Sequence, residues 1–392
     1  MTLQSCLDHI YSGYLAAKPL LAGRPDSETR DPRPLMELLA EMRLIPPAER
    51  VIRVTGSKGK GSVSRLAAAA LTVAGEGPVG LVVSPEEDHA LDRIRIDGQA
   101  IPEEDFIAVH ARLKPRLDAL AASLKPGRYL SPFGLFLAVA LAWFKEKGVR
   151  RFVIEGGRGV RHDETGLFPS ATSIVTSILP EHLAQIGPTE EDVARDKLSI
   201  AANSRRLLLG PLAASWADRL GIPGESIAQP PAEAAPAWYE LDRALAQAAT
   251  GHPVPLAPVP SFGRCLWRGR EIVHEAAIAP ASLDFDFLAR LKETMPGLHA
   301  LVSLPDDKDV TGVVAALESR GLPPFHVELT GERGFLSHET AKRLWPERNK
   351  GAVRYDDAPA LAEILDSLPP GPLYLAGTQT FLRLVRRMIA AD

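Results

Sequence analysis

Residues 51–62 read VIRVTGSKGKGS, and this stretch decides the fold class. Positions 51–54 form a short run rich in β-branched residues that predicts a strand, and the apolar pattern of 63–73 predicts a helix directly afterwards. A glycine-rich turn in this context lets backbone N–H groups approach phosphate oxygens, while its lysine adds a positive charge and its serine a hydroxyl for Mg²⁺. The alternative is a flexible Gly/Lys turn. We predict a triphosphate-binding loop that is made of Gly56, Ser57, Lys58, Gly59, Lys60, Gly61 and Ser62.

The rest of the first half alternates strand patterns with helix patterns. Strands are predicted at 51–54, 80–83, 152–154, 173–178 and 206–209. The helix-length apolar patterns at 63–73 and 135–147 suit the crossovers that join parallel strands. The predicted fold class is therefore α/β, with a doubly wound, mostly parallel sheet that carries the phosphate loop.

The second half predicts a further α/β body. Its strands are predicted at 272–273, 300–303, 326–329 and 373–375. Pro and Ala dominate 223–260, a helix pattern covers 238–248, and a boundary is expected between 250 and 262. We predict an ATP-binding domain at 1–255 and a smaller, Rossmann-like domain at 256–392.

Composition excludes several classes of protein. Of the 392 residues, 45% are hydrophobic and 24% charged, which is an ordinary globular balance, and a net charge of -4 gives no basic surface for nucleic acid. The longest apolar run, 133–144, is shorter than the ~20 residues that span a bilayer and predicts a buried helix. Cys6 and Cys265 lie far apart, and the amino terminus lacks a signal-peptide pattern. We expect a cytoplasmic monomer or small homo-oligomer with no nucleic-acid or membrane partner.

The loop departs from the general phosphate-loop pattern, because Gly61 stands between Lys60 and the hydroxyl residue. In this form it resembles the GTNGKGS loop of the folylpolyglutamate synthases, which are relatives of the Mur ligases. Ser84-Pro85, then DRIRIDG at 92–98, then IPEEDF at 101–106 resemble family segments in the same order. The resemblance implies an ATP- and Mg²⁺-dependent amide ligase in which Ser62 and Ser84 are metal ligands.

Two further metal ligands are implied by the resemblance. Glu155 ends a predicted strand, and EGGRGVRHDET at 155–165 resembles the family's EVGLGGRLDAT, whose leading Glu binds Mg²⁺. His182 follows the strand at 173–178, and its PEH segment resembles the family's LDH, whose histidine binds a second Mg²⁺. A strand-end surface acid and a structural histidine are the alternatives.

Lys197 has an inward position on a predicted helix. TEED at 189–192 resembles a helix start, and Val193, Lys197 and Ile200 then share one stripe. Burial favours the neutral amine, which can react with carbon dioxide. ARDK at 194–197 resembles the family's REK segment, whose lysine is carbamylated and binds metal. The alternative is a lysine that extends along the surface into solvent.

The second domain carries fainter family segments and two departures. Phe262-Gly263-Arg264 resembles the family's PGR, which implies that Arg264 reaches the ATP phosphates, and DKD at 307–309 and AGT at 376–378 resemble later segments. The family's DxAHNP aligns with EAAIAP at 275–280, so Glu275 replaces the Asp and the His and Asn are missing. Gly134 stands where the family commonly has a Glu, close to the substrate-binding region.

The family reaction gives the predicted chemistry. A carboxylate attacks the γ-phosphate of ATP, and an amino acid amine then displaces phosphate from the acyl phosphate. Lys60, Arg264, His182 and Lys197 are the predicted catalytic residues, with ATP and Mg²⁺ as cofactors and a small-molecule carboxylate and an amino acid as substrates. Three interpretations follow: a folate or folate-like polyglutamate ligase, the same chemistry on another carboxylate, or a non-catalytic nucleotide-binding scaffold.

Overall fold

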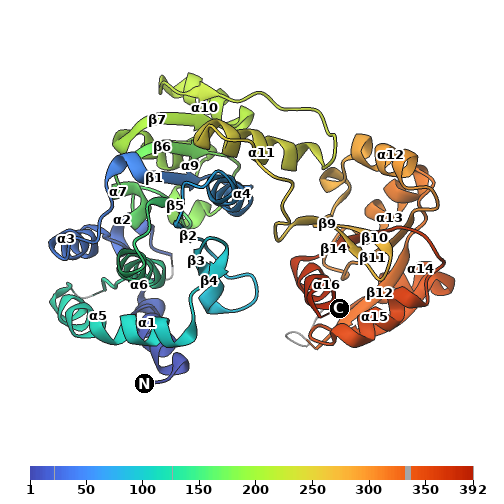
Figure 1. Ribbon diagram of the computed structural model, residues 1–392, viewed down its shortest axis with the longest axis horizontal. Coiled ribbons are helices and arrows are strands. Elements are labelled where there is room, and N and C mark those ends of the chain that lie inside the picture. The colour runs from blue at the N-terminus through green and yellow to red at the C-terminus, as the bar shows by residue number, and fades with distance from the viewer. Residues whose placement is uncertain (22, 126, 332–336, 392) are drawn as a thin grey trace. The chain divides into compact units, whose positions relative to one another are not determined.

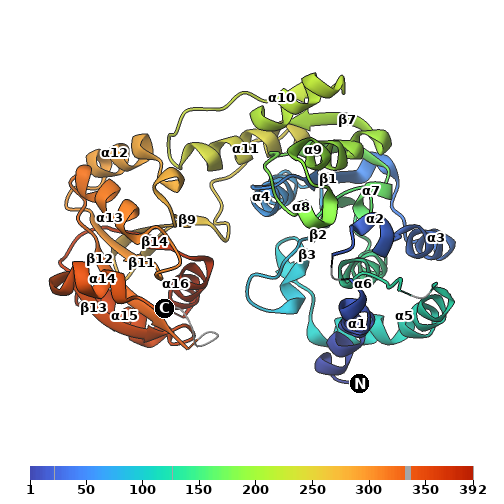
Figure 2. The same ribbon diagram turned by 180° about the vertical axis from the view of Figure 1, so that it is seen from behind.

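The computed structural model describes residues 1–21, 23–125, 127–331 and 337–391. Their contacts divide the chain into two compact units, drawn from opposite sides in Figure 1 and Figure 2. Unit 1 contains Met1–Pro230 and Leu241–Pro255, and unit 2 contains Pro231–Glu240 and Leu256–Asp392.

Unit 1 is built on an eight-stranded sheet in the order β4-β3-β2-β5-β1-β6-β7-β8. Its strands are β1 (Val51–Thr55), β2 (Val79–Val82), β3 (Ile94–Ile96), β4 (Gln99–Ala100), β5 (Arg151–Glu155), β6 (Ser170–Val175), β7 (Ser204–Leu209) and β8 (Glu225–Ser226). All neighbouring pairs are parallel except β2 with β3 and β3 with β4. Every residue of β1 and β2 is buried, as expected for a parallel sheet with helices on both faces.

The helices of unit 1 are α1 (Leu3–Ala17), α2 (Asp26–Thr29), α3 (Arg33–Glu41), α4 (Lys60–Val73), α5 (Glu103–Ser123), α6 (Pro132–Glu146), α7 (Glu164–Leu167), α8 (Leu183–Ile186), α9 (Glu190–Leu198), α10 (Pro211–Leu220) and most of α11 (Ala237–Thr250). Short 3₁₀ turns are η1 (Lys18–Leu20), η2 (Ala48–Arg50), η3 (Ala90–Arg93) and η4 (Ser199–Asn203). Figures 1 and 2 both show α1, α5 and α6 side by side near the amino terminus.

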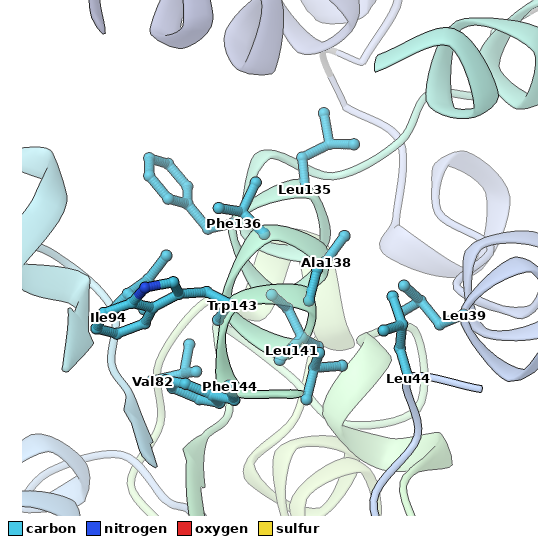
Figure 3. Close-up of a cluster of buried hydrophobic side chains, with 14 of the residues drawn as sticks. Leu39, Leu44, Val82, Ile94, Leu135, Phe136, Ala138, Leu141, Trp143 and Phe144 are labelled. Carbon is cyan, nitrogen blue, oxygen red and sulfur yellow. The ribbon is translucent and has the colours of Figure 1, made fainter. Parts of the chain in front are cut away.

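Helix α6 lies within a buried hydrophobic cluster of unit 1. Its residues are apolar on all sides because neighbours surround it, and Figure 3 shows Leu39 and Leu44 on one side of it and Val82 and Ile94 on the other. Pro132 opens the helix, and the Ser131 hydroxyl accepts a hydrogen bond from Gly134 N at its start. The prediction of a buried helix over this apolar run is confirmed.

Unit 2 has a six-stranded sheet in the order β13-β12-β11-β14-β10-β9, parallel except for the pair of β9 and β10. Its strands are β9 (Phe262–Trp267), β10 (Arg270–Glu275), β11 (His299–Ser303), β12 (Phe325–Thr330), β13 (Asn349–Arg354) and β14 (Leu373–Gly377). Its helices are α12 (Phe285–Thr294), α13 (Val310–Ser319), α14 (Glu339–Leu344), α15 (Ala358–Asp366) and α16 (Gln379–Ala390), with 3₁₀ turns η5 (Pro280–Ser282) and η6 (Pro346–Arg348). The α/β prediction, with a mostly parallel sheet and a smaller second α/β body, is confirmed.

One predicted strand is shifted by three residues. The strand expected at 173–178 is β6 at Ser170–Val175, because Thr176 and Ser177 leave the sheet to bind the backbone of the glycine-rich loop. A hairpin of β3 and β4 was not predicted, although Asp97 and Gly98 between the strands both have positive φ, as an Asp-Gly hairpin turn requires. In the part of the chain that the structure describes, no helix is both long and apolar enough to cross a membrane.

Candidate active site

The phosphate loop lies between β1 and α4, as predicted, and the chain after β6 fixes its first half. Ser57 N donates to Ser177 O at 2.8 Å, and Lys58 N donates to Ser177 Oγ at 2.9 Å. Gly56 has a φ of +140°, and a Cβ there would lie 2.0 Å from Thr176 Oγ1. A side chain at this position would clash with Thr176, so the conformation of the loop requires glycine at position 56.

The Lys60 amine folds back over the loop. Lys60 is the first residue of α4, and its Nζ donates to Gly56 O at 2.8 Å. Burial lowers the pKa of this amine, and the nearby Glu155 opposes the shift. The loop therefore holds a positive charge over its own backbone, where a bound phosphate would lie.

Glu155 ends β5 beside the start of α4. It is 3% exposed, and its Oε2 accepts a hydrogen bond from Ser84 N at 3.2 Å. A Cβ on Gly61 would lie 3.6 Å from the same oxygen. Burial raises the pKa of the Glu155 carboxyl to about 7, although Arg65 and Lys60 act in the opposite direction. The predicted residues Ser84 and Glu155 thus lie at the loop, with Ser84 acting through its backbone.

Lys197 approaches the same loop from α9. Its side chain is fully buried, so it does not extend into solvent, and its Nζ lies 2.9 Å from Glu181 Oε1 and donates to Gly56 O at 3.2 Å. Helix α9 begins after Thr189, whose hydroxyl accepts from Asp192 N, and the expected helix start is confirmed. His182 lies at the start of α8, and its side chain is largely exposed. The part of the imidazole that is shielded from solvent lowers its pKa, and the nearby Glu181 opposes the shift.

This set of residues fits Mg²⁺ with a nucleotide only if phosphate oxygens complete the metal's coordination. Among the described residues, no group of three or more His, Cys, Asp or Glu side chains could hold a metal alone. Mg²⁺ is commonly bound through one or two carboxylates together with substrate phosphates. Glu155 and the Ser62 hydroxyl can supply oxygen ligands of this kind beside the loop.

Comparisons with known proteins agree with this geometry. No family model matches the chain. The dihydrofolate synthase/folylpolyglutamate synthase of Escherichia coli (strain K12) is 24% identical over 368 residues, which are 84% of this chain and 85% of that protein. The probable bifunctional folylpolyglutamate synthase/dihydropteroate synthase of Haloferax volcanii is 36% identical over 159 residues, but the match spans only 18% of that protein.

Solved structures match over the whole chain. A complex of E. coli FolC with DHPP and ADP has a TM-score of 0.70 at 20% identity and covers 100% of this chain and 98% of that one. The folylpolyglutamate synthase of Thermotoga maritima has a TM-score of 0.67 at 17% identity, covering 96% of this chain and 97% of that one. The chain is similar in sequence to a folylpolyglutamate synthase over most of its length, and it has the fold of these enzymes. The resemblance found in its motifs is confirmed.

The family residues expected in unit 2 have different environments. Arg264 lies on β9, with its Nη2 3.3 Å from Glu271 Oε1, and lines a hollow of about 500 Å³ together with Phe287 and Arg290. Asp309 caps α13 by accepting from Gly312 N, so at least this part of the DKD segment has a local structural function.

Glu275 is an interior residue of unit 2. Its Oε1 accepts from Trp238 Nε1 at 3.0 Å, and its Oε2 accepts from Tyr374 Oη at 2.8 Å. Burial raises the pKa of this carboxyl to about 7. A nucleotide contact by Glu275 would require these two hydrogen bonds to break, and the predicted contact stays a prediction.

Gly134, which stands where the family commonly has a Glu, lies against the carboxyl of Glu164. A Cβ on Gly134 would lie 2.4 Å from Glu164 Oε1, which accepts from Ser131 Oγ at 2.9 Å. In the family segment EVGLGGRLDAT, the position of Glu164 is an Ala. In this chain the carboxyl of Glu164, at the start of α7, occupies the space beside Gly134.

Glu164 belongs to a buried ionic cluster. Arg30 Nη2 lies 3.1 Å from Asp163 Oδ2 and 3.8 Å from Glu164 Oε2. Burial alone would lower the pKa of Arg30, but the surrounding carboxylates outweigh it and raise the pKa. Burial and the charge of Asp163 raise the pKa of Glu164 to about 7, against the effect of Arg30. None of these residues was predicted as a site residue, because the cluster joins segments more than 100 positions apart.

Asp242 is a second residue that sequence reasoning missed. It lies on α11, and its Oδ1 would be 2.6 Å from a Cβ on Gly59 in the phosphate loop. Its only sequence signal is an acid among the apolar residues Tyr239, Leu245 and Ala246 at helical spacing.

Proposed function

We propose that the chain is an ATP-dependent ligase that joins a small-molecule carboxylate to an amino acid such as glutamate through an acyl phosphate. The observation that carries the proposal is the meeting of two amines, the partly buried Lys60 and the fully buried Lys197, at the Gly56 carbonyl of the predicted phosphate loop, with Glu155 nearby. Phosphoryl transfer depends mainly on positioning and on neutralising charge, and these groups are suited to both tasks.

Each residue has a task in this proposal. The loop N–H groups and Lys60 bind and orient the phosphates, and Arg264 neutralises charge on the transferred phosphoryl group. Glu155, Ser62, Ser84 and His182, with a carbamylated Lys197, would hold Mg²⁺, which lowers the negative charge that opposes attack by the substrate carboxylate. The amino acid amine then attacks the acyl carbon and phosphate leaves, so no protein nucleophile is required.

The location and partners are part of the proposal. Both cysteines are free, which suits a reducing cytoplasm, and the substrates would be a small carboxylate and an amino acid. A folate-like carboxylate is supported by the E. coli relative, whose name includes dihydrofolate synthase. The second candidate, the same chemistry on another carboxylate, is favoured by the Glu164 carboxyl that occupies the space beside Gly134.

A substrate panel tests the proposal. Purified protein is assayed for ADP release with Mg²⁺, ATP, glutamate or other amino acids, and a set of carboxylates that contains dihydropteroate, tetrahydrofolate and non-pteridine acids. We expect ADP release that requires both the carboxylate and the amino acid, and its loss in Lys60→Ala. Release by no combination, with ATP binding intact, would favour the scaffold interpretation instead.

A further inference from the structure

The phosphate loop is held by two separate parts of unit 1. Residues that follow β6 bind its first half, at Ser57 and Lys58. Its second half meets α11, which approaches from a position about 180 residues later in the chain. The second half contains Gly59 and the Ser62 hydroxyl, which would face the phosphates and the metal.

Asp242 is the α11 residue that makes this contact. It is 4% exposed, and the buried residues Leu245 and Ala246, three and four positions later, anchor the same face of the helix. Its carboxyl group lies beside the Gly59 backbone, and its Oδ2 is buried without a hydrogen-bond partner. Since α11 is fixed by its apolar stripe, the carboxyl is presented to the loop from a rigid element.

The Asp242 carboxyl lies in the space beside Gly59. Gly59 has a φ of +83°, which L side chains rarely adopt, and a Cβ there would lie 2.6 Å from Asp242 Oδ1. The carboxyl therefore occupies the space beside the glycine and limits the backbone to its left-handed conformation. That conformation directs the start of α4, and with it Lys60 and Ser62.

We propose that Asp242 is a positioning residue of the nucleotide site, which holds Gly59 and Ser62 in the conformation that receives the triphosphate. The inference rests on the proposed nucleotide chemistry. The alternative is that Asp242 only anchors α11, in which case its loss changes stability but neither the loop nor the affinity for ATP.

The test compares Asp242→Ala, Asp242→Leu and Asp242→Asn with the wild type. The Leu variant keeps the bulk of the side chain on α11 without a polar atom beside Gly59, and the Asn variant retains the shape of the carboxyl and an oxygen at that place. Hydrogen exchange of the amides at 59–62 is followed without nucleotide, and ATP affinity is measured by calorimetry. The control is Asp105→Ala, which removes another unit 1 carboxyl that accepts a hydrogen bond, from Trp143 Nε1 at 2.9 Å.

We expect the Ala and Leu variants to exchange the loop amides faster and to bind ATP about tenfold more weakly. The Asn variant should remain within about threefold of the wild type, and the control should leave both measurements unchanged. Wild-type loop exchange and ATP affinity in Asp242→Leu would overturn the proposal, as would an Asn variant as impaired as the Leu variant. If the wild type binds no ATP, the proposed function fails, while the exchange data still decide whether Asp242 positions the loop.

Discussion

A partly buried amine, that of Lys60, and a fully buried one, that of Lys197, meet at one carbonyl in unit 1. Lys60 Nζ lies 2.8 Å and Lys197 Nζ 3.2 Å from Gly56 O, and Glu181 pairs with Lys197 at 2.9 Å. A carbamate on Lys197 would replace one of these positive charges by a negative group beside Glu181. Two anions at that distance require a cation between them, so carbamylation and Mg²⁺ binding should depend on each other.

Replacing Lys197 with Ala tests this dependence. The variant should lose at least about a hundredfold in turnover, because a metal ligand is missing at the transferred phosphoryl group. Acetate or formate, supplied in the assay, should restore part of the activity by occupying the place of the missing anion. ADP release is measured with and without the added carboxylate.

Lys114→Ala is the control, because Lys114 pairs with Asp118 on α5 at 2.6 Å and lies outside the site. It should show wild-type turnover and no response to acetate. Normal turnover in Lys197→Ala would remove Lys197 from the proposed metal site. ¹³C-labelled carbon dioxide should give a carbamate signal in the wild type that is absent from Lys197→Ala.

At the scale of the elements, hydrophobic periodicity predicted what depends on local sequence. The central strands, α4, α6 and α9 were predicted because each carries an apolar run or an apolar stripe that is visible within about ten residues. Residues 176–178 were assigned to a strand because an apolar pattern does not show where a chain leaves its sheet to bind a loop. Asp242 and Glu164 were missed because their importance comes from neighbours more than 25 positions away, at Gly59 and Gly134.

Helices α6 and α7 should be coupled through Gly134 and Glu164. Gly134→Ala in a helix would normally stabilise by up to about 1 kcal/mol, but here the new methyl meets Glu164 Oε1 at 2.4 Å and Leu35 at 2.7 Å. We expect a net loss of about 1–3 kcal/mol in the free energy of unfolding. In a Glu164→Ala background, Gly134→Ala should lower the free energy of unfolding by a smaller amount, with a difference of at least about 0.5 kcal/mol measured by urea unfolding.

The matched control is Gly13→Ala in α1, where the nearest atom to the new Cβ is 3.9 Å away. This variant should be neutral or slightly more stable than the wild type. If the cost of Gly134→Ala is the same with and without Glu164, the two side chains do not share the space.

At the scale of the whole molecule, each unit buries a carboxyl at the end of a strand, Glu155 in unit 1 and Glu275 in unit 2. Burial raises the pKa of Glu275 from 4.5 to about 7. Between pH 4.5 and about 7, the folded state therefore holds a proton that the unfolded state has released. This contribution to stability is present below pH 4.5 and is lost as the pH rises towards 7. Relative to Glu275→Gln, the free energy of unfolding of the wild type should fall by on the order of 3 kcal/mol as the pH rises from 4.5 to 7, as measured by urea unfolding. Parallel pH profiles for the two proteins would contradict the raised pKa.

The proposed reaction draws on both units, with Lys60, Glu155 and Lys197 from unit 1 and Arg264 from unit 2. Arg264 pairs with Glu271 at a partly exposed position, so Arg264→Ala should change the free energy of unfolding by less than about 1 kcal/mol. Because a planar guanidinium neutralises phosphoryl charge through two hydrogen bonds, the same variant should lose at least about a hundredfold in ADP release. Arg264→Lys keeps the charge without the paired donors and should recover only part of that loss.

Arg290→Ala, in the same hollow, controls for a general loss of positive charge and should stay within about threefold of the wild type. Wild-type ADP release in Arg264→Ala would show that unit 1 carries out the phosphoryl transfer without this arginine.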